Sequence, residues 1–525
     1  MDSSDVLKIL WKGVKSKPKH KATSSGVKNE PIKREILEHG PLKGEELKKE
    51  EPDSDEDDVE IIAKTDVSAA EDVGRFRKTH GISVKGKNIP DPFAEFEQLS
   101  SDPYSVNSHI VENLRSLGYQ RPTPVQMQAI PALLQRRHVL VTAPTGSGKT
   151  AAFLVPVLAA LRRPSRKGVR ALILAPTREL AKQIFRECAI LAAGTDLKAD
   201  YVTKLRSDEG SKFSRKFDLL ISTPNRLVHV LRNSPDLIDL STVEWLIVDE
   251  SDKLFEAGMR GFRDQLAEIY KLCDNENLVR GMFSATYTVH VERWCRKNLK
   301  KLVEINAGTK RRNTTVDSVD QELIYVGTEA GKLGAFRNLI IKGFSPPALV
   351  FVQSKDRAKQ LFDELLYDGI NVDVIHADRT QQQRDNVVRA FREGKIWVLI
   401  CTDVLGRGVD FCGVKLVVNY DFPTSAISYV HRVGRTGRAG MRGRAVTFFT
   451  NEDRPALRSI ARVMKDSGCP VPEYMLTLKD GRRKDRPEGA PVREDISTSK
   501  KLGKRKSTAA KSTVEKRKKL PSSGD

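Results

Sequence analysis

The chain has 525 residues, of which 39% are hydrophobic, so it is long enough for two or three domains that each bury a core. Lysine and arginine outnumber aspartate and glutamate by 90 to 69, and the resulting charge of +21 favours a polyanionic partner, either nucleic acid or an anionic membrane surface. There is no run of about 18 apolar residues, and residues 1–20 contain no signal-peptide core, so we expect a soluble intracellular protein with no membrane partner.

Residues 1–90 are rich in lysine, glutamate, aspartate and serine and include the acidic run EEPDSDEDDVEII. Such a segment buries too little apolar surface to offset its chain entropy, so it predicts a disordered charged extension. Ser54 lies among acids and suits an acid-directed kinase, although an unregulated solvated stretch explains the same composition.

Residues 91–306 alternate strand-like and helix-like segments and predict a first α/β domain. The strand-like segments are HVLVTA, RALILAP, FDLLIST, VEWLIVD and RGMFSAT. Near-continuous apolar strands interleaved with amphipathic helices indicate a parallel sheet that is covered on both faces.

The sequence APTGSGKT at 143–150 predicts a phosphate-binding loop between a buried strand and a helix. Gly146 and Gly148 lack Cβ atoms, so backbone N–H groups can close around phosphate oxygens. Lys149 supplies a mobile positive charge, and Thr150 offers a hydroxyl to Mg²⁺. The pattern favours a site for a nucleoside triphosphate over an ordinary glycine-serine turn.

Two acids, Asp249 and Glu250, follow the apolar run VEWLIV. Ligands of open α/β sheets bind at the carboxyl ends of the strands, so both carboxylates should face the phosphates held by Lys149. We expect Asp249 to hold Mg²⁺, through water, and Glu250 to orient or deprotonate the attacking water. Adjacent acids also occur at solvated strand ends, but the upstream loop favours catalysis.

A polar stretch at 307–317 predicts a linker, and residues 318–477 predict a second domain of the same α/β class. Its strand-like segments are ALVFVQS, VDVIH, IWVLICTD, VKLVVNYD and GRAVTFFT. Within it, HRVGRTGRAG carries Arg432, Arg435 and Arg438 at every third position. A nucleic-acid-binding tail can have this composition, but a position inside a domain favours Arg435 and Arg438 as arginine fingers that reach ATP across a cleft.

The last segment, 478–525, predicts a disordered basic tail with the clusters KRK and KRKK. A nuclear import signal, an auxiliary RNA contact and a solubilising tail all remain open as interpretations. The six cysteines contain no CxxC pair and no histidine at metal-ligand spacing. We read them as reduced thiols, and one or two reactive cysteines stay an open alternative.

In their order across about 93–450, these motifs resemble those of the DEAD-box RNA helicases. The resemblance implies two tandem RecA-like parallel-sheet domains that close on ATP, Mg²⁺ and RNA. The loop begins with Ala143, the form that the family uses, and its other residues, Pro144, Thr145 and Ser147, would join the nucleotide site.

The segment GYQRPTPVQMQAIP is similar to the adenine-reading segment of that family. The resemblance implies that Gln126 hydrogen-bonds the adenine edge and that Tyr119 packs on the base. An upstream aromatic, which we assign as Phe96, would complete the pocket.

By the same resemblance, the segments PTRELAKQ and TPNRL would line the RNA path of the first domain. The residues implied to touch the sugar-phosphate backbone are Thr177, Arg178, Thr223 and Arg226. The family's double glycine between these segments is absent, and YVTKLRSDEGSKF occupies that region. In the tripeptide SAT, hydroxyl bonds from Ser284 and Thr286 would link the ATP state to the acids.

In the second domain, VFVQS resembles another RNA-binding segment of the family, and Gln381 and Arg384 match its QxxR element. The resemblance also implies roles for residues of the segments TDVLGRGVD and HRVGRTGRAG. Thr402 and Asp403 would face the RNA backbone, Gly408 and Asp410 would face the ATP phosphates and ribose, and His431 and Arg432 would tie this domain to the acids.

Ser251 and Gly406 stand where alanine is usual in the family. With TPNR, these variants are similar to the nucleolar branch that assists small-ribosomal-subunit assembly. We therefore expect an enzyme of the nucleus and nucleolus that is a monomer, acts on pre-rRNA or snoRNA-containing assemblies, and responds to a protein activator.

The expected activity is ATP hydrolysis to ADP and phosphate coupled to local unwinding or remodelling of RNA. An ATP-gated RNA clamp or ribonucleoprotein scaffold without productive unwinding is the alternative, because the same residues would build it. A DNA translocase is disfavoured by the Gln126 segment. The RNA target, the activator and the oligomeric state stay open.

Overall fold

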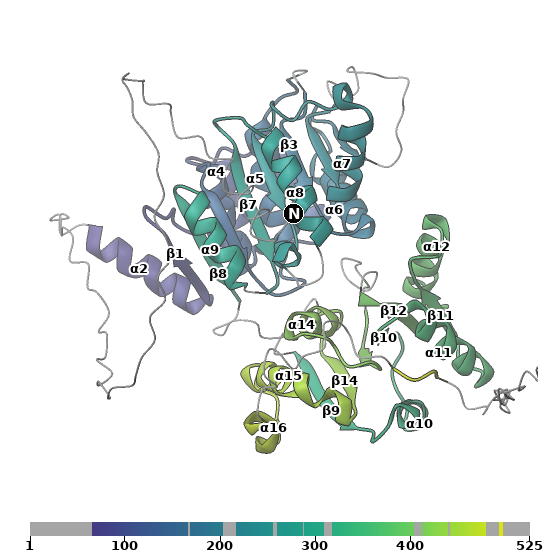
Figure 1. The fold of residues 1–525 in the computed structure, drawn as a ribbon. Coiled ribbons are helices and arrows are strands. Elements are labelled where there is room, and N and C mark those ends of the chain that lie inside the picture. Colours follow the sequence, from purple (N-terminus) through teal and green to yellow (C-terminus); the bar gives the residue numbers. More distant parts are fainter. Residues whose placement is uncertain are drawn as a thin grey trace, which may run out of the picture.

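The computed structural model describes residues 66–478 and 493–496, apart from 166–167, 203–216, 256–259, 287, 309–317, 404–410, 412 and 439–440. Two α/β domains follow one another along the chain, each built on its own sheet (Figure 1). The predicted fold class of two tandem parallel-sheet domains is therefore confirmed.

The first domain contains an eight-stranded sheet in the order β1-β8-β2-β7-β6-β3-β5-β4. Its strands are β1 (Ile82–Lys85), β2 (His138–Thr142), β3 (Ala171–Leu174), β4 (Ala199–Tyr201), β5 (Leu219–Ser222), β6 (Trp245–Val248), β7 (Val279–Ser284) and β8 (Leu302–Ala307). All neighbours are parallel except β1 and β8. Because β7 lies between β2 and β6, the segments after these three strands meet at one edge of the sheet.

Helices cover both faces of this sheet, as the apolar strands predict. The helices are α2 (Asp66–Thr79), η1 (Phe96–Ser100), α3 (Ser108–Ser116), α4 (Pro124–Leu134), α5 (Lys149–Leu161), α6 (Arg178–Leu191), α7 (Pro224–Asn233), η4 (Pro235–Leu237), η5 (Ser251–Phe255), α8 (Arg260–Leu272) and α9 (Val289–Asn298). Alternate strand residues enter opposite cores: Val139 and Val141 pack with α3 to α6, whereas Leu140 packs with α7 to α9.

The first domain begins earlier than the sequence predicts. We expected disorder throughout 1–90, but α2 and β1 lie within this range, and β1 pairs with β8. Arg77 donates to the buried Gln128 at 2.8 Å and to the Pro90 carbonyl at 3.0 Å. The prediction was wrong for 66–90 because only Ile82 of this edge strand is buried, which leaves almost no apolar pattern to detect.

The second domain contains a six-stranded parallel sheet in the order β11-β12-β10-β13-β14-β9. Its strands are β9 (Val319–Tyr325), β10 (Ala348–Val352), β11 (Val372–Ile375), β12 (Val398–Thr402), β13 (Leu416–Asn419) and β14 (Gly443–Phe449). Its helices are α10 (Glu329–Ile341), α11 (Lys355–Tyr367), α12 (Gln381–Arg392), α14 (Ala426–Val433), η6 (Asn451–Asp453), α15 (Arg454–Asp466) and α16 (Glu473–Thr477). Helices α10 and α11 cover one face, and α12, α14 and α15 cover the other.

The ends of this domain fall close to the predicted limits of 318 and 477, while most of the linker lies outside the described residues. The tail differs from the prediction, because residues 493–496 pack against the second domain and Ile496 is buried. Ser54 and the basic clusters of the tail lie outside the described residues. Among the described helices, none has the length and apolarity to cross a membrane.

The cysteines behave as structural residues. Five lie in the described part of the chain, all are free thiols, and four are buried. Burial raises the pKa of Cys188 and of Cys273 to about 12, so these two thiols stay protonated and unreactive at neutral pH.

Candidate functional site

A pocket of about 380 Å³ lies where the two domains meet. Its lining residues are Tyr119, Thr123, Thr145, Gly146, Gly148, Lys149, Thr150, Leu180, Gln183, Glu187, Asp249, Glu250, Ala285, Gly413, His431, Arg435, Arg438 and Met441. The predicted phosphate loop, acids and arginines therefore come together, although they are spread over nearly 300 positions of the sequence.

The loop after β2 closes on its own lysine. Lys149 Nζ donates to the carbonyls of Ala143 at 2.8 Å and Pro144 at 2.7 Å. Burial lowers the pKa of Lys149 to about 8, against the opposing charges of the nearby acids. Gly148 has φ of +83° at the start of α5, and a Cβ there would lie 2.5 Å from Gln126 Nε2, so this position requires glycine.

The predicted adenine segment is fastened to this loop. Gln126 is fully buried, accepts from Thr123 N at 2.9 Å and donates to the Gly148 carbonyl at 3.1 Å. Tyr119 lines the pocket, and its hydroxyl donates to Glu187 at 3.0 Å. The amide of Gln126 thus couples the segment to the glycine that shapes the phosphate loop.

Phe96 is a correction to the predicted base pocket. Its side chain is 2% exposed, packs in the core beside Phe93, and is not among the residues that line the pocket. An aromatic at roughly the right distance along the sequence was assigned to the base, but its position in η1 makes it a core residue.

The acids extend from the carboxyl end of β6. Burial raises the pKa of Asp249 to about 6. Burial also raises the pKa of Glu250, but the charges of Lys253, His431 and Arg435 outweigh it and bring the value to about 2. Lys253 Nζ lies 3.3 Å from Glu250 Oε2. Glu250 has φ of +48°, a conformation that costs a non-glycine residue about 1–3 kcal/mol and is concentrated at functional sites.

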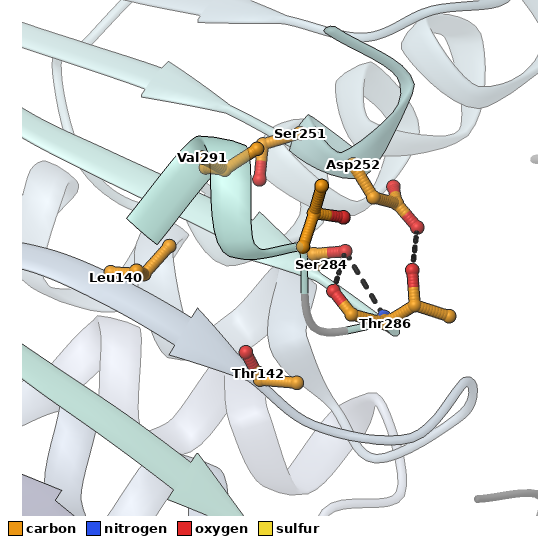
Figure 2. A pocket seen from close by; sticks show the side chains of 8 residues that line it. Leu140, Thr142, Ser251, Asp252, Ser284, Thr286 and Val291 are labelled. Carbon is orange, nitrogen blue, oxygen red and sulfur yellow. Dashed lines mark hydrogen bonds between the residues drawn. The ribbon is translucent and has the colours of Figure 1, made fainter. Parts of the chain in front are cut away.

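Asp252 joins three parts of the site. Its Oδ2 accepts from Thr286 Oγ1 and lies 2.6 Å from His431 Nε2. The side chains of Asp252 and His431 are both fully buried. Ser284 differs from the prediction: its hydroxyl donates to the Thr286 carbonyl at 2.9 Å and accepts from Thr286 N at 3.1 Å (Figure 2). Only Thr286 reaches an acid directly, and Ser284 orders Thr286.

A small cavity of about 10 Å³ lies beside these bonds, and Ser251 is one of the residues that line it (Figure 2). Ser251 Oγ, Asp252 Oδ1 and Thr288 Oγ1 are buried and have no hydrogen-bond partner among the described residues. A cavity of this volume and polarity holds about one water molecule. Ser251 therefore faces this cavity, and its hydroxyl makes no hydrogen bond to the second domain among the described residues.

The predicted arginine fingers both reach the pocket. Arg435 Nη2 lies 3.9 Å from Glu250 Oε1, and Arg438 packs against Gly146. Backbone carbonyls orient both guanidinium groups, because Arg435 Nε donates to His431 O at 3.1 Å and Arg438 Nε donates to Gly434 O at 2.9 Å.

Two further observations concern the arginine segment. Thr145 Oγ1 donates to Gly434 O at 3.0 Å, which ties the phosphate loop to the second domain. Arg432, expected to reach the acids, instead pairs with Asp403 at 2.5 Å and donates to the Asp421 carbonyl at 2.7 Å. Its position on α14 directs it into its own sheet, so of the two residues His431 and Arg432 only His431 reaches an acid of the first domain.

The residues predicted to contact RNA in the first domain follow the carboxyl ends of β3 and β5. Thr177 is the N-cap residue of α6, and its hydroxyl accepts from Leu180 N at 3.3 Å. Thr223 is the N-cap residue of α7 and is buried. Arg178 is exposed, whereas Arg226 is partly exposed and its Nε is buried without a hydrogen-bond partner among the described residues. Their RNA contacts stay predictions.

The QxxR residues contact the first domain. Arg384 Nε lies 3.0 Å from Glu179 Oε1, and Gln381 Nε2 lies 3.5 Å from the same oxygen. Beside them, Lys182 Nζ lies 2.5 Å from Asp385 Oδ2. We refer to these two ion pairs as the RNA-side contacts, after the predicted RNA-binding residues around them.

In the last predicted RNA-binding segment of the second domain, Thr402 ends β12 and is partly exposed. Asp403 accepts from Arg432 and from Ser428 at 3.1 Å. Gly408 and Asp410 lie outside the described residues.

Two family models match the chain: DEAD/DEAH box helicase over residues 123–294 and helicase conserved C-terminal domain over residues 331–440. The chain is 54% identical over 453 residues to the probable ATP-dependent RNA helicase DDX52 of Bos taurus, covering 85% of this chain and 76% of that protein. This chain belongs to the DEAD-box ATP-dependent RNA helicases. It is also 40% identical to the ATP-dependent RNA helicase ROK1 of Eremothecium gossypii, over 91% of this chain and 86% of that protein.

Solved structures are similar to this helicase in fold. Dbp5 of S. cerevisiae bound to RNA and ADP BeF3 aligns with a TM-score of 0.62 at 27% identity, covering 71% of this chain and 93% of that one. Mss116p bound to ssRNA and AMP-PNP aligns with a TM-score of 0.63 at 25% identity, covering 73% and 78%. Both domains of the helicase therefore adopt the RecA-like arrangement that the resemblance implies.

Sequence reasoning missed several residues of the helicase site. Lys253, Glu179, Lys182 and Asp385 form ion pairs that link the motifs. Glu179 and Lys182 lie inside the segment PTRELAKQ, so their neighbourhood was visible. Their partners lie about 200 positions away, and no local pattern identifies such pairing.

The residues of the pocket fit Mg²⁺ only together with a nucleotide. Among the described residues, no cluster of three acid, histidine or cysteine side chains could hold a metal alone. Thr150 and Asp249 both line the pocket, and burial raises the pKa of Asp249 although the charge of Lys149 opposes this shift, so a further cation would stabilise the charged carboxylate. Mg²⁺ prefers such sites, with one or two protein oxygens, phosphate oxygens and water.

Proposed function

We propose that this ATP-dependent RNA helicase completes its ATPase site only when its two domains close around ATP and RNA. The observation that carries this proposal is the buried contact between Asp252 of the first domain and His431 of the second, at the wall of the pocket. One domain supplies the loop and the acids, and the other supplies the arginines, so neither contains a complete site.

The loop residues would hold the phosphates of ATP, with Lys149 released from its carbonyl partners to bind them. Thr150 and Asp249 would hold Mg²⁺, which neutralises phosphate charge and orients the β- and γ-phosphates. The attacking water forms a bond to the γ-phosphorus while the bond to the ADP oxygen breaks, and the proton leaves with phosphate. Glu250, with a pKa near 2, orients this water rather than deprotonating it.

Arg435 and Arg438 would stabilise the negative charge that develops on the transferred group. Each guanidinium is held by a backbone carbonyl, so little reorganisation is needed when the nucleotide binds. The RNA path would run along Thr177, Arg178, Thr223 and Arg226 and then onto Gln381, Arg384, Thr402 and Asp403. Closure aligns both ligand surfaces, so ATP and RNA should each favour binding of the other.

We further propose pre-rRNA in small-subunit ribosome assembly as the substrate, with the nucleolus as the location, a protein activator and a monomeric chain. Support comes from Ser251, Gly406 and TPNR, which match that branch of the family, and from the charge of +21. Crosslinking of RNA to the protein in cells tests this proposal. We expect enrichment of pre-rRNA, and enrichment of messenger RNA alone would refute the assignment.

Strand separation and RNA clamping are distinguished by Glu250→Gln. We expect the wild-type protein to separate a short RNA duplex with ATP, and the variant to retain RNA with ATP while hydrolysis falls by about 100-fold. Arg280→Gln, a change away from the pocket, serves as the control. Wild-type protein that retains RNA under ATP but separates no duplex would refute the unwinding activity and support the clamp.

A further inference from the structure

Residues 493–496 of the C-terminal segment are fastened to the second domain. Ile496 N donates to Gln360 Oε1 at 2.9 Å, and Gln360 Nε2 donates to Asp495 Oδ1 at 2.7 Å. The Ile496 side chain packs into the core that α10 and α11 form with the sheet. The segment is thus held by backbone, polar and apolar contacts at once.

The side chain of Arg493 enters a buried cluster of charges and is only 1% exposed. Its nitrogen atoms lie 2.6 Å from Glu329, 2.7 Å from Asp453 and 2.9 Å from the Gln353 side-chain oxygen. The planar guanidinium can satisfy three acceptors in different directions, which a lysine ammonium cannot do in the same geometry.

Arg493 balances the charge of this cluster. The side chains of Glu329, Asp421 and Asp453 are at most 6% exposed, and the cations that contact them among the described residues are Lys332, Arg357 and Arg493. Without Arg493, three buried carboxylates would share two cations. A buried charge without a partner is strongly unfavourable, so the cluster and the segment should hold one another in place.

The cluster supports the end of β10. Gln353 directly follows this strand; its N–H donates to Asp421 Oδ2 at 2.9 Å, and its side chain accepts from Arg493. The Asp421 carbonyl accepts from Arg432, which in turn pairs with Asp403. The charged cluster therefore connects the C-terminal segment to two of the segments assigned to RNA.

We propose that Arg493 is a positioning residue for RNA binding, which holds Gln353 and the carboxyl edge of β10 in the shape that meets the RNA backbone. The inference rests on the proposed function and extends its RNA path to the segment VFVQS, which resembles an RNA-binding segment of the family. The C-terminal segment then contributes to RNA binding by the second domain, although its sequence predicts a polar tail.

The test uses the full chain with Arg493→Met and Arg493→Lys. We expect the RNA concentration for half-maximal ATPase stimulation to rise about fivefold or more in both variants, with a smaller rise for lysine. The ATP concentration for half-maximal rate at saturating RNA should change less than about twofold. Glu494→Gln is the matched control, because Glu494 contacts Arg357 only through its backbone carbonyl. A normal RNA dependence in folded Arg493→Met protein would overturn the proposal, and so would an equal change in the ATP and RNA dependences.

A double-mutant cycle with Gln353→Ala separates this inference from the proposed RNA path. If Arg493 acts through Gln353, Arg493→Lys adds little to the RNA defect of Gln353→Ala. Additive defects would overturn the positioning role. If Gln353→Ala itself leaves the RNA dependence unchanged, the RNA role of its segment fails and the inference fails with it. A Gln353→Ala defect with normal Arg493 variants refutes the inference alone.

Discussion

Two groups of contacts join the domains, and they differ in burial. On the nucleotide side, His431 and Asp252 are 2.6 Å apart and both side chains are 0% exposed. On the RNA side, the side chains of Arg384 and Glu179 are 11% and 10% exposed, and those of Lys182 and Asp385 are 32% and 40% exposed. The charges on the nucleotide side are therefore withdrawn from water, while those on the RNA side increasingly face it.

Because of this difference in burial, the two groups of contacts should have different effects on closure of the two domains. A buried ion pair that loses one partner leaves an uncompensated charge and costs about 3–5 kcal/mol, whereas an exposed pair contributes about 0–1 kcal/mol and is screened by salt. The nucleotide-side contacts should decide whether the ATPase site assembles. The RNA-side contacts should adjust how strongly RNA promotes that assembly.

The largest effect is expected for His431→Ala. Asp252 would remain buried with Thr286 but without its partner from the second domain, so the RNA-stimulated ATPase rate should fall about 100-fold or more. Steady-state ATPase assays with saturating RNA measure this loss. His290→Ala, at an exposed position of α9, is the control. A rate within fivefold of wild type corresponds to a change in activation free energy of about 1 kcal/mol or less. Such a small change would contradict the central role of the buried contact.

A charge exchange tests the RNA-side pair of Glu179 and Arg384, whose side chains are 10% and 11% exposed. Glu179→Arg and Arg384→Glu each place like charges about 3 Å apart, so each should reduce the ability of RNA to tighten ATP binding by about tenfold. The double variant restores the pair in reverse and should recover much of this coupling. Nucleotide titrations with and without RNA measure it. Failure of the double variant to recover would show that Arg384 acts on RNA directly.

The difference between the two groups of contacts also explains what the sequence could predict. Lys149, Asp249 and Glu250 follow directly from local patterns, because a strand followed by a glycine loop or by acids restricts the chemistry at its end. The strands themselves were recognisable from their apolar runs. His431 and the arginines were found through their spacing and the family resemblance.

Local sequence patterns did not reveal which side chains contact one another or which are buried in the core. Ser284 and Thr286 share a tripeptide, yet only Thr286 bonds an acid, because the backbone turns Ser284 toward its neighbour. Phe96 shows the opposite error, in which an aromatic at a plausible spacing is buried in the core. Arg493 carried no signal at all, since one arginine in a polar tail resembles many others until its buried acceptors are known.

A smaller effect is expected for Lys182→Met, because this pair is the most exposed of the contacts between the domains described above. Its loss should weaken RNA-coupled nucleotide binding by about two- to fivefold at low salt. Salt at about 0.5 M should remove the difference from wild type, since screening shortens electrostatic reach to a few ångströms. Lys271→Met, an exposed change at the end of α8, is the control. A defect that persists at high salt would assign Lys182 a role other than this ion pair.

The smallest effect is expected for Ser251→Ala, which separates burial from cross-domain contact. Ser251 is as buried as Asp252 and lies next to it, but its hydroxyl faces the small cavity and has no protein partner among the described residues. Because the change removes no ion pair, it should alter the free energy of unfolding by less than about 1 kcal/mol and the ATPase rate by less than about twofold. Thermal unfolding and ATPase assays measure both. A loss comparable to that of His431→Ala would mean that any disturbance of this buried edge disables the helicase, and the contact with the second domain would lose its special status.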